Sequence, residues 1–207
     1  MIKEFGRACA VTVLSLTLAL AVTTARGDDS TETIVFVRHG EKPDNGLGQL
    51  NCQGLNRALA LPAIIAKNFG KPDAVFAPNP SAQKVDDGET YDYVRPLATI
   101  EPAAIAFSLP VNTQFGLSDV KGLQDSFEQA RYRNAFILVA WEHKYIEAIA
   151  RALLTAHAAD PAMVPEWQGH DFDSIYVVTI ARTGDATKAT FARKQEGLDG
   201  QPTACPR

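Results

Sequence analysis

Two of the four histidines in this chain follow stretches that are typical of buried β-strands. His39 comes directly after residues 34–38, which read Ile-Val-Phe-Val-Arg, and His143 follows the apolar stretch that ends in Trp-Glu at residues 136–142. In open α/β sheets, ligands bind beyond the carboxyl ends of the strands. We therefore expect both imidazoles at a ligand-binding edge, where a neutral imidazole can act as a nucleophile.

The residues on either side of the first of these histidines suit a phosphorylated ligand. The guanidinium of Arg38 offers paired donors that match phosphate oxygens. His39 can attack phosphorus, and Gly40 lets the backbone approach a ligand closely. A strand end with a hydrogen-bonded histidine and a surface arginine is the structural alternative, and the Arg-His pair alone would favour it.

Longer motifs resemble the histidine phosphatase superfamily, also called the phosphoglycerate-mutase-like family. Residues 37–42 (Val-Arg-His-Gly-Glu-Lys) resemble its signature, and residues 50–58 resemble the segment between its first loop and first helix. Arg95 opens a predicted helix, like the family's second arginine. Glu142 and His143 close a predicted strand, as the family's second histidine does. The four motifs occur in the family's order.

The resemblance implies a role for each matching residue. His39 would be the nucleophile that becomes phosphohistidine, Arg38 and Arg95 would clamp the phosphoryl oxygens, and His143 would donate to the same oxygens. Such fixed donors stabilise the negative charge of the transition state. Lys42 would lie at the pocket mouth and attract anionic substrates. The resemblance implies no metal and no organic cofactor.

The general acid is not assigned by the resemblance. Lys144 follows the second histidine where acid phosphatases and phytases of this superfamily carry aspartate, so the chain resembles the simpler branch. Many enzymes of that branch use a glutamate from an insertion, but the corresponding residues 111–125 contain no glutamate. This segment offers only Asp119 and Asp125.

Two further carboxyl groups are candidates for the acid. Glu41 follows the first motif, and Glu142 directly precedes His143. Strand alternation would turn the Glu142 side chain to the opposite face of the strand, away from the histidine. We nevertheless favour Glu142 among the candidates, because the end of a buried strand fixes its position.

Strands and helices alternate along the chain, which predicts an α/β fold. We expect a three-layer α/β/α sandwich around a mostly parallel sheet, and the resemblance implies the phosphoglycerate-mutase-like version of it. The last two strands, joined by a short turn, predict an antiparallel edge. Polar residues 78–93 predict a loop. Strands are expected at 34–38, 73–77, 111–115, 135–141, 174–181 and 189–194, and helices at 53–69, 95–107, 118–132 and 144–157.

The first 27 residues are typical of a secretory signal peptide. A short basic segment precedes an uncharged, mostly apolar run at residues 11–22, and small residues then allow cleavage after Ala25 or Gly27. The run is shorter than the about 20 residues of a membrane span, although an uncleaved anchor is the alternative. Residues 28–207 would form a single periplasmic or secreted domain without membrane attachment.

Composition and cysteine count further restrict the class of protein. Hydrophobic residues make up 46% of the 207 residues and the net charge is −4, which excludes a disordered chain and argues against a nucleic-acid partner. Cleavage would remove Cys9 and leave Cys52 and Cys205 in an oxidising compartment. A bond between them would hold the C-terminal tail near the first helix, and two free thiols are the alternative.

These patterns together predict an exported phosphatase, a histidine acid-type phosphomonoester hydrolase. It would act on small phosphomonoesters through a phosphohistidine on His39, with a small phosphorylated substrate or inorganic phosphate as its partner. The alternative is an exported phosphate-binding or regulatory pseudo-phosphatase with negligible turnover. A phosphomutase is less favoured, because the mutases of this family are usually longer.

Overall fold

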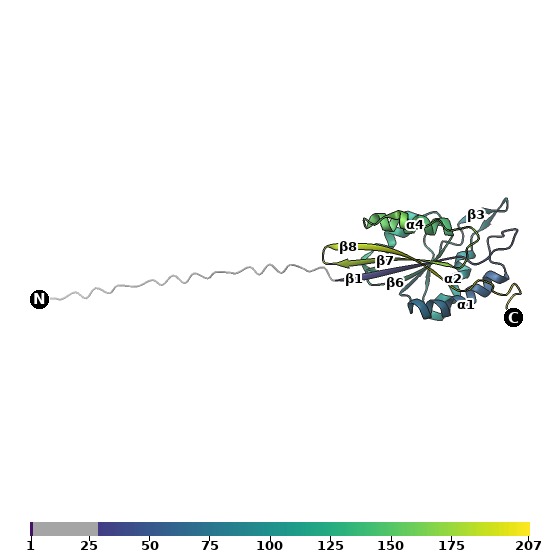
Figure 1. The fold of residues 1–207 in the computed structure, drawn as a ribbon, viewed down its shortest axis with the longest axis horizontal. Helices are drawn as coiled ribbons and strands as arrows, with labels where there is room; N and C mark the ends of the chain where they lie inside the picture. Colours follow the sequence, from purple (N-terminus) through teal and green to yellow (C-terminus); the bar gives the residue numbers. More distant parts are fainter. Residues whose placement is uncertain (2–28) are drawn as a thin grey trace.

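The computed structural model describes Met1 and residues 29–207, so the predicted signal peptide lies outside the described residues. None of the helices in this part of the chain has both the length and the apolar character that a membrane span requires. The described residues form one central sheet with helices on both of its faces (Figure 1).

Six strands build the central sheet: β1 (Ser30–Arg38), β2 (Ala74–Phe76), β5 (Val111–Asn112), β6 (Phe136–Trp141), β7 (Ser174–Thr183) and β8 (Ala186–Gln195). Their spatial order is β5-β2-β6-β1-β7-β8. The first four of these are paired in parallel, whereas β7 runs antiparallel to both of its neighbours. The predicted mostly parallel sheet with an antiparallel edge is confirmed.

Within residues 29–207, four α-helices cover the two faces of the sheet: α1 (Cys52–Phe69), α2 (Arg95–Phe107), α3 (Val120–Phe127) and α4 (His143–Ala156). On β1, Val35 and Val37 join the core that contains residues of α1 and α2. Ile34 and Phe36 point the other way and join the core with α3 and α4. An apolar strand buried on both faces accounts for the unbroken apolar run in the sequence, and the three-layer sandwich is confirmed (Figure 1).

Local signals set the ends of α1, which begins one residue before the predicted range 53–69 and ends where it was predicted to end. Asn51 caps the helix, because its side-chain oxygen accepts a hydrogen bond from the backbone N–H of Gly54 at 2.9 Å. Gly70 ends it with a φ of 87°, a conformation that glycine adopts without strain. Pro62 lies inside this helix.

The prediction of a loop over residues 78–93 was wrong in part. β3 (Gln83–Asp86) and β4 (Glu89–Asp92) pair as an antiparallel hairpin outside the main sheet. Asp87 and Gly88 form its turn with φ values of 54° and 83°, and an Asp-Gly pair favours such a two-residue turn. The hairpin is polar on both faces, so hydrophobic alternation gave no sign of it.

The third helix also differs from its prediction. We expected Ser118 to cap a helix that runs to residue 132. Instead Asp119 is the cap and accepts a hydrogen bond from Gly122 N at 2.9 Å, and α3 ends at Phe127. Short 3-10 helices follow at η1 (Ala130–Tyr132) and later at η2 (Pro161–Met163), and β5 has only two of the five predicted residues.

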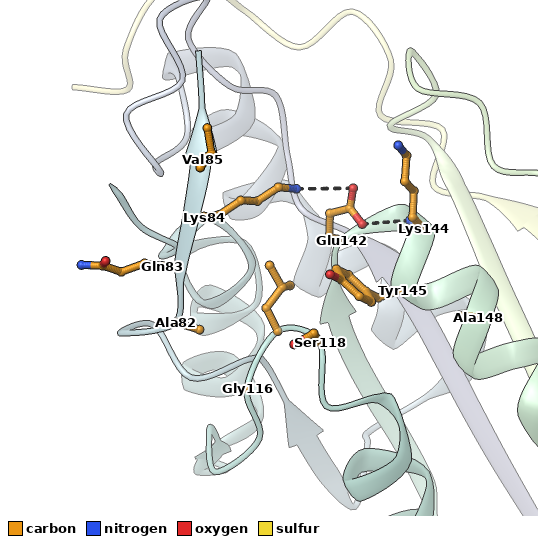
Figure 2. A pocket seen from close by; sticks show the side chains of 11 residues that line it. Ala82, Gln83, Lys84, Val85, Gly116, Ser118, Glu142, Lys144, Tyr145 and Ala148 are labelled. Carbon is orange, nitrogen blue, oxygen red and sulfur yellow. Dashed lines mark hydrogen bonds and ion pairs between the residues drawn. The ribbon is translucent and has the colours of Figure 1, made fainter. Parts of the chain in front are cut away.

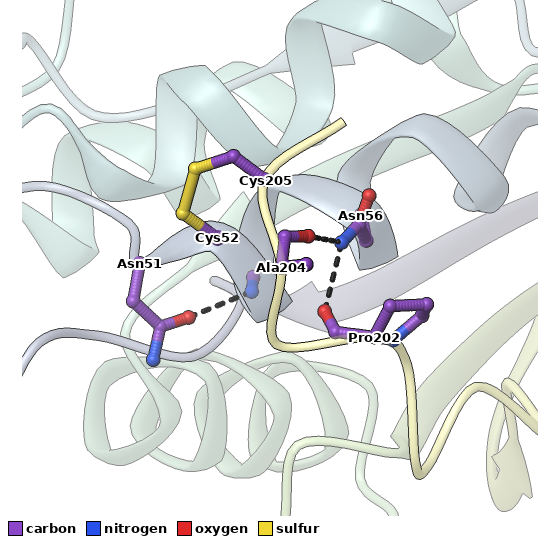
Figure 3. The surroundings of a disulfide bond; sticks show 7 residues. Asn51, Cys52, Asn56, Pro202, Ala204 and Cys205 are labelled. Atoms are coloured by element: carbon purple, nitrogen blue, oxygen red, sulfur yellow. Dashed lines mark hydrogen bonds between the residues drawn. A yellow bond between two sulfur atoms is a disulfide. The ribbon is translucent and has the colours of Figure 1, made fainter. Parts of the chain in front are cut away.

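A disulfide ties the C-terminal tail to the start of α1. Cys52 and Cys205 are bonded, with 4.5 Å between their Cα atoms, and this is the predicted pairing. The amide of Asn56 donates to the carbonyl oxygens of Pro202 and Ala204, both at 2.8 Å (Figure 3). The tail therefore has both a covalent and a hydrogen-bonded attachment to the first helix.

Candidate active site

The topology brings the two strand-end histidines to one edge of the sheet. β1 and β6 are adjacent and parallel, and Arg38 is the register partner of Trp141. The backbone N–H of His39 continues this ladder and donates to the carbonyl oxygen of Trp141 at 3.1 Å. Residues that follow both strands, among them His143, therefore emerge side by side at the carboxyl edge.

Close packing fixes the backbone directly after the first histidine. The N–H of Gly40 donates to the hydroxyl of Thr99 on α2 at 2.9 Å. A Cβ atom on Gly40 would lie 2.9 Å from the Cα atom of Gly54 on α1, which is closer than real Cβ contacts allow. Glycine is therefore required where β1 meets the first helix.

His39 is buried, with 3% of its surface exposed, and it is held as a neutral imidazole. Its Nδ1 lies 2.8 Å from the carbonyl oxygen of Gly40. A carbonyl oxygen only accepts, so Nδ1 carries the hydrogen and Nε2 carries the lone pair. Burial lowers the pKa of His39 well below its ordinary value, and the charges of Arg38 and Arg95 lower it further. Nε2 thus has the electronic state of a nucleophile.

Arg38 is held by backbone carbonyls. Its Nη1 donates to the oxygens of Gly169 at 2.9 Å and Asp171 at 2.8 Å, and its guanidinium carbon lies 3.9 Å from the ring centre of Phe172. Its Nε is buried and has no hydrogen-bond partner in the described part of the chain. Burial lowers the pKa of Arg38 from its ordinary value.

Arg95, the first residue of α2, is fixed in a similar way. Its Nη1 donates to the carbonyl oxygen of Gly46 at 3.2 Å and to Oδ2 of Asp86. Its Nε is also buried without a partner among residues 29–207. Both arginines are thus anchored through Nη1, which leaves an unpaired donor on each guanidinium.

Tyr93 belongs to this cluster, and sequence reasoning missed it. Its ring meets the ring of His39 edge to face at 5.9 Å, and the guanidinium carbon of Arg95 lies 4.6 Å from its ring centre. The hydroxyl is buried with no partner in the described residues, and burial raises its pKa, so it stays protonated. Its only sequence signal was its position two residues before the arginine.

Glu142 lies beside the second histidine, so the strand-alternation argument does not hold. The strand ends at Trp141, and Glu142 caps α4 with its Oε2 accepting from the N–H of Lys144 at 3.0 Å. This turn brings its Oε1 to 3.2 Å from Nδ1 of His143, without the orientation of a hydrogen bond. The same oxygen lies 3.5 Å from Nζ of Lys84 (Figure 2).

The environment of His143 also favours the neutral imidazole. Burial lowers the pKa of His143 below its ordinary value, and the positive charge of Arg38 acts in the same direction, while Glu142 opposes them. His143 can therefore donate one hydrogen without carrying a charge at neutral pH.

A pocket of about 720 Å³ opens next to Glu142. The hairpin, the segment before α3 and the first turns of α4 enclose it (Figure 2). Its lining combines cationic, acidic and apolar side chains, including Lys84, Val85, Leu117, Glu142, Lys144 and Tyr145. The volume suits a small organic group, and Glu142 is the lining residue that connects this pocket to the histidine cluster.

The other candidate acids have partners elsewhere. Asp119 caps α3, and Asp125 pairs with the exposed Lys121 at 2.6 Å. Both oxygens of Glu41 accept hydrogen bonds from Arg57, at 2.8 to 3.1 Å. None of these three contacts involves the histidine cluster, so Glu142 is the candidate that the structure places beside it.

Lys42 lies at the edge of the site with its charge already paired. Its Nζ is 2.8 Å from Oδ1 of Asp86, the residue whose other oxygen binds Arg95. The side chain of Lys42 is 40% exposed. Its role in attracting substrates stays a prediction.

Metal ligation has no support in the geometry of residues 29–207. Within them, no three histidine, cysteine, aspartate or glutamate side chains converge as metal ligands would. The polar centre of the site consists instead of guanidinium, imidazole and hydroxyl donors, which suit an anion.

The fold is the phosphoglycerate-mutase-like fold, shared with solved structures of the histidine phosphatase superfamily. A mycobacterial glucosyl-3-phosphoglycerate phosphatase with inorganic phosphate superposes with a TM-score of 0.54 at 14% identity, covering 78% of this chain and 95% of its own. SixA from Nakamurella multipartitia, assigned as a phosphohistidine phosphatase, gives 0.52 at 16% identity and covers 81% and 98%.

A third structure extends the likeness to mutases. Phosphoglycerate mutase from Plasmodium falciparum gives a TM-score of 0.50 at 12% identity, covering 86% of this chain and 98% of its own. No family model matches the sequence, and no curated protein matches it. At these identities the likeness establishes the fold.

Proposed function

We propose that this protein is a phosphatase that hydrolyses small phosphomonoesters through a phosphohistidine on His39. The observation that carries the proposal is the set of buried, unpaired donors around this neutral imidazole: Nε of Arg38, Nε of Arg95 and the hydroxyl of Tyr93. Buried polar groups are almost always hydrogen-bonded. A ligand with several acceptor oxygens, such as a phosphoryl group, would satisfy all three.

The reaction would proceed in two displacements at phosphorus. Nε2 of His39 attacks in line, a bond forms between nitrogen and phosphorus, and the bond from phosphorus to the leaving oxygen breaks. Water then attacks the phosphohistidine, the nitrogen–phosphorus bond breaks, and inorganic phosphate leaves. Arg38, Arg95 and His143 stabilise the charge on the phosphoryl oxygens in both transition states.

Glu142 is the proposed general acid. It lines the pocket in which the leaving group would lie and is positioned by its capping bond. Its proton would pass to the leaving oxygen in the first step, and the resulting carboxylate would take a proton from the attacking water in the second. One group thus serves both steps, and the protons balance over the cycle.

Phosphoryl chemistry is also what the similar structures are named for. The mycobacterial protein is a phosphatase whose structure holds inorganic phosphate, and the Plasmodium protein is a phosphoglycerate mutase. Hydrolysis is the activity that we propose, and mutase activity is an alternative, since this chain covers 98% of the Plasmodium mutase and length does not separate the two. Phosphate binding without turnover is the remaining alternative.

Hydrolysis of p-nitrophenyl phosphate tests the proposal, because its leaving group needs little protonation. The wild-type protein should hydrolyse it, and His39→Ala should abolish the activity. His157→Asn is the matched control, since His157 pairs with Glu128 at 2.9 Å and lies at the opposite end of α4 from His143. A ³²P-labelled substrate quenched in alkali should leave label on the wild type only. Phosphate binding with no hydrolysis would support the alternative.

Glu142→Gln tests the acid. General acid catalysis contributes about 10²–10⁴-fold, so in single-turnover measurements the amide should slow the phosphorylation of His39 by alkyl phosphates by a factor of that order and spare its phosphorylation by aryl phosphates. Asp125→Asn, at an exposed ion pair, is the control. Equal losses in the phosphorylation step with both substrate classes would exclude Glu142 as the acid.

We further propose that the protein is exported to the periplasm or beyond. The N-terminal sequence and the presence of a disulfide support this location. N-terminal sequencing of the protein from a fractionated native host should show a start after Ala25 or Gly27. An intact N-terminus in the membrane fraction would support an uncleaved anchor.

A further inference from the structure

One carboxylate on the hairpin joins three segments around the site. Asp86, at the end of β3, is buried although its strand is polar. Its Oδ2 accepts from Nη1 of Arg95, and its Oδ1 accepts from Nζ of Lys42 at 2.8 Å. The hairpin, the loop after β1 and the start of α2 therefore meet at this side chain.

The loop after β1 is shaped to receive that carboxylate. Gly46 has a φ of 74°, and a Cβ atom there would lie 2.6 Å from Oδ2 of Asp86, so an added side chain would have to displace the carboxylate. The carbonyl oxygen of the same glycine accepts the second hydrogen bond of Nη1 of Arg95. The glycine thus makes room for Asp86 and completes the anchor of the arginine.

These contacts fix the orientation of the Arg95 guanidinium and of its unpaired Nε. Both hydrogens of Nη1 are used, one by Asp86 and one by Gly46, so the guanidinium plane is fixed. Burial raises the pKa of Asp86, but the hydrogen bonds from Lys42 and Arg95 outweigh it and hold that pKa below its ordinary value. The carboxylate therefore stays ionised over the neutral range and keeps its hold on the arginine.

We propose that Asp86 is a positioning residue that aims Arg95 at the phosphoryl group, so that the β3–β4 hairpin is part of the active site. This inference rests on the proposed phosphatase function. Neither the sequence motifs nor the strand-end geometry assigns a role to Asp86. Misplacement of a catalytic group by about 1 Å can reduce a rate about 10²-fold, so the effect is large enough to measure.

A double-mutant cycle tests the inference. Asp86→Asn should reduce kcat/KM for p-nitrophenyl phosphate about 10- to 100-fold and weaken vanadate binding. Asp87→Asn is the matched control, because it removes the same charge one residue away at an exposed turn position, and it should change both quantities less than about 2-fold. In the Arg95→Ala background, Asp86→Asn should cost less than about 3-fold, because the group through which it acts is gone.

Two glycine variants test the same contact without changing any charge. Gly46→Ala would displace the carboxylate and should reproduce the loss seen in Asp86→Asn. Gly88→Ala is its control, since Gly88 has a similar φ of 83° but no atom within 4 Å of an added Cβ. Circular dichroism and melting temperature would identify folded variants.

Each result supports or overturns the positioning role of Asp86. Equal losses from Asp86→Asn with and without Arg95 would overturn the positioning role while leaving the proposed function intact, and so would a fully active Gly46→Ala. If Asp86→Asn fails to fold, the glycine pair decides alone. A wild-type protein that neither hydrolyses p-nitrophenyl phosphate nor binds phosphate would overturn the proposed function, and the inference with it.

Discussion

Arg57 in α1 and the arginines of the candidate site are all buried, but their partners differ in kind. Arg57, with a side chain 1% exposed, contacts four carboxylates, those of Glu41, Asp173, Glu196 and Asp199. Arg38 contacts two backbone carbonyls, and Arg95 contacts one carboxylate and one carbonyl. The four carboxylates therefore carry more negative charge than Arg57 carries positive charge. Arg38 and Arg95 have one carboxylate partner between them, so together they keep a net positive charge.

The difference separates a structural arginine from a binding arginine. A buried charge is costly unless a counter-charge accompanies it. The protein supplies that counter-charge in full at Arg57 but leaves it incomplete at Arg38 and Arg95, where unpaired Nε atoms remain. A phosphoryl group would supply the missing charge there. The number of carboxylates that contact a buried arginine therefore indicates whether the arginine is structural or binds a ligand.

The largest expected effect is a loss of stability when Arg57 is replaced. Arg57→Met should lower the free energy of unfolding by about 3–5 kcal/mol, because removing one partner of a buried ion pair leaves the carboxylates uncompensated. Urea denaturation measures this change. The activity of the molecules that remain folded should be close to that of the wild type. A stable but inactive variant would contradict the comparison.

The site arginines should show the opposite pattern. Arg38→Ala and Arg95→Ala should each cost about 2–4 kcal/mol of transition-state stabilisation, by analogy with lost oxyanion donors. Phosphate and vanadate binding should weaken as well. The free energy of unfolding should change little, since a poorly compensated charge is removed. Steady-state kinetics and urea denaturation check both parts, and full activity in either variant would refute the assigned roles.

The disulfide tests whether Arg57 and its carboxylate partners hold the C-terminal tail in place. Two of its carboxylates, Glu196 and Asp199, belong to the tail that Cys205 bonds to Cys52. The Cys52→Ser, Cys205→Ser double variant should lose about 2–4 kcal/mol of stability and stay active. Combined with Arg57→Met, its loss should be less than additive, because both changes release the same segment.

Thiol titration is the direct check on the disulfide. Denatured, unreduced mature protein should show no free thiol. Two titratable thiols would show that the bond is absent from the mature protein.

The smallest effect concerns the buried carboxyl of Glu32, which Arg182 contacts at 3.1 Å while Arg182 also lies 3.7 Å from Glu128. Burial raises the pKa of Glu32 to about 7, against the opposing hydrogen bond from Arg182. A carboxyl with a raised pKa contributes stability below about pH 4.5 that is lost as pH rises through about 7. Glu32→Gln should remove this dependence. Between pH 5 and pH 9, we expect the stability of the variant to rise by about 2–3 kcal/mol relative to the wild type in denaturant titrations.

Sequence patterns predicted the parts of the fold that depend on short-range information. The strand at residues 34–38 was visible because both of its faces are buried, and α1 was visible from its ending glycine. His39 and His143 could be placed together because parallel strands end at a common edge. These inferences needed only neighbours in the sequence and general rules of sheet topology.

Residues whose roles depend on distant partners could not be found in this way. Arg57 lies 139 residues from Glu196, and no local pattern records that contact. Asp86 and Tyr93 lie in a polar segment that was predicted to be a loop, so nothing indicated which of its side chains turn inward. The side-chain direction of Glu142 depends on the point at which a strand becomes a helix cap.

Strand β1 begins at Ser30 and ends at Arg38, so the residues before it and His39 lie at opposite ends of the strand. Its nine residues span about 30 Å at about 3.3 Å each. Anything joined ahead of Ser30 therefore attaches at the edge away from His39. The C-terminal tail runs instead beside α1, close to the loop that carries Gly46. For immobilisation on a bead or an electrode, coupling through the N-terminal side would leave the histidine cluster facing the solution.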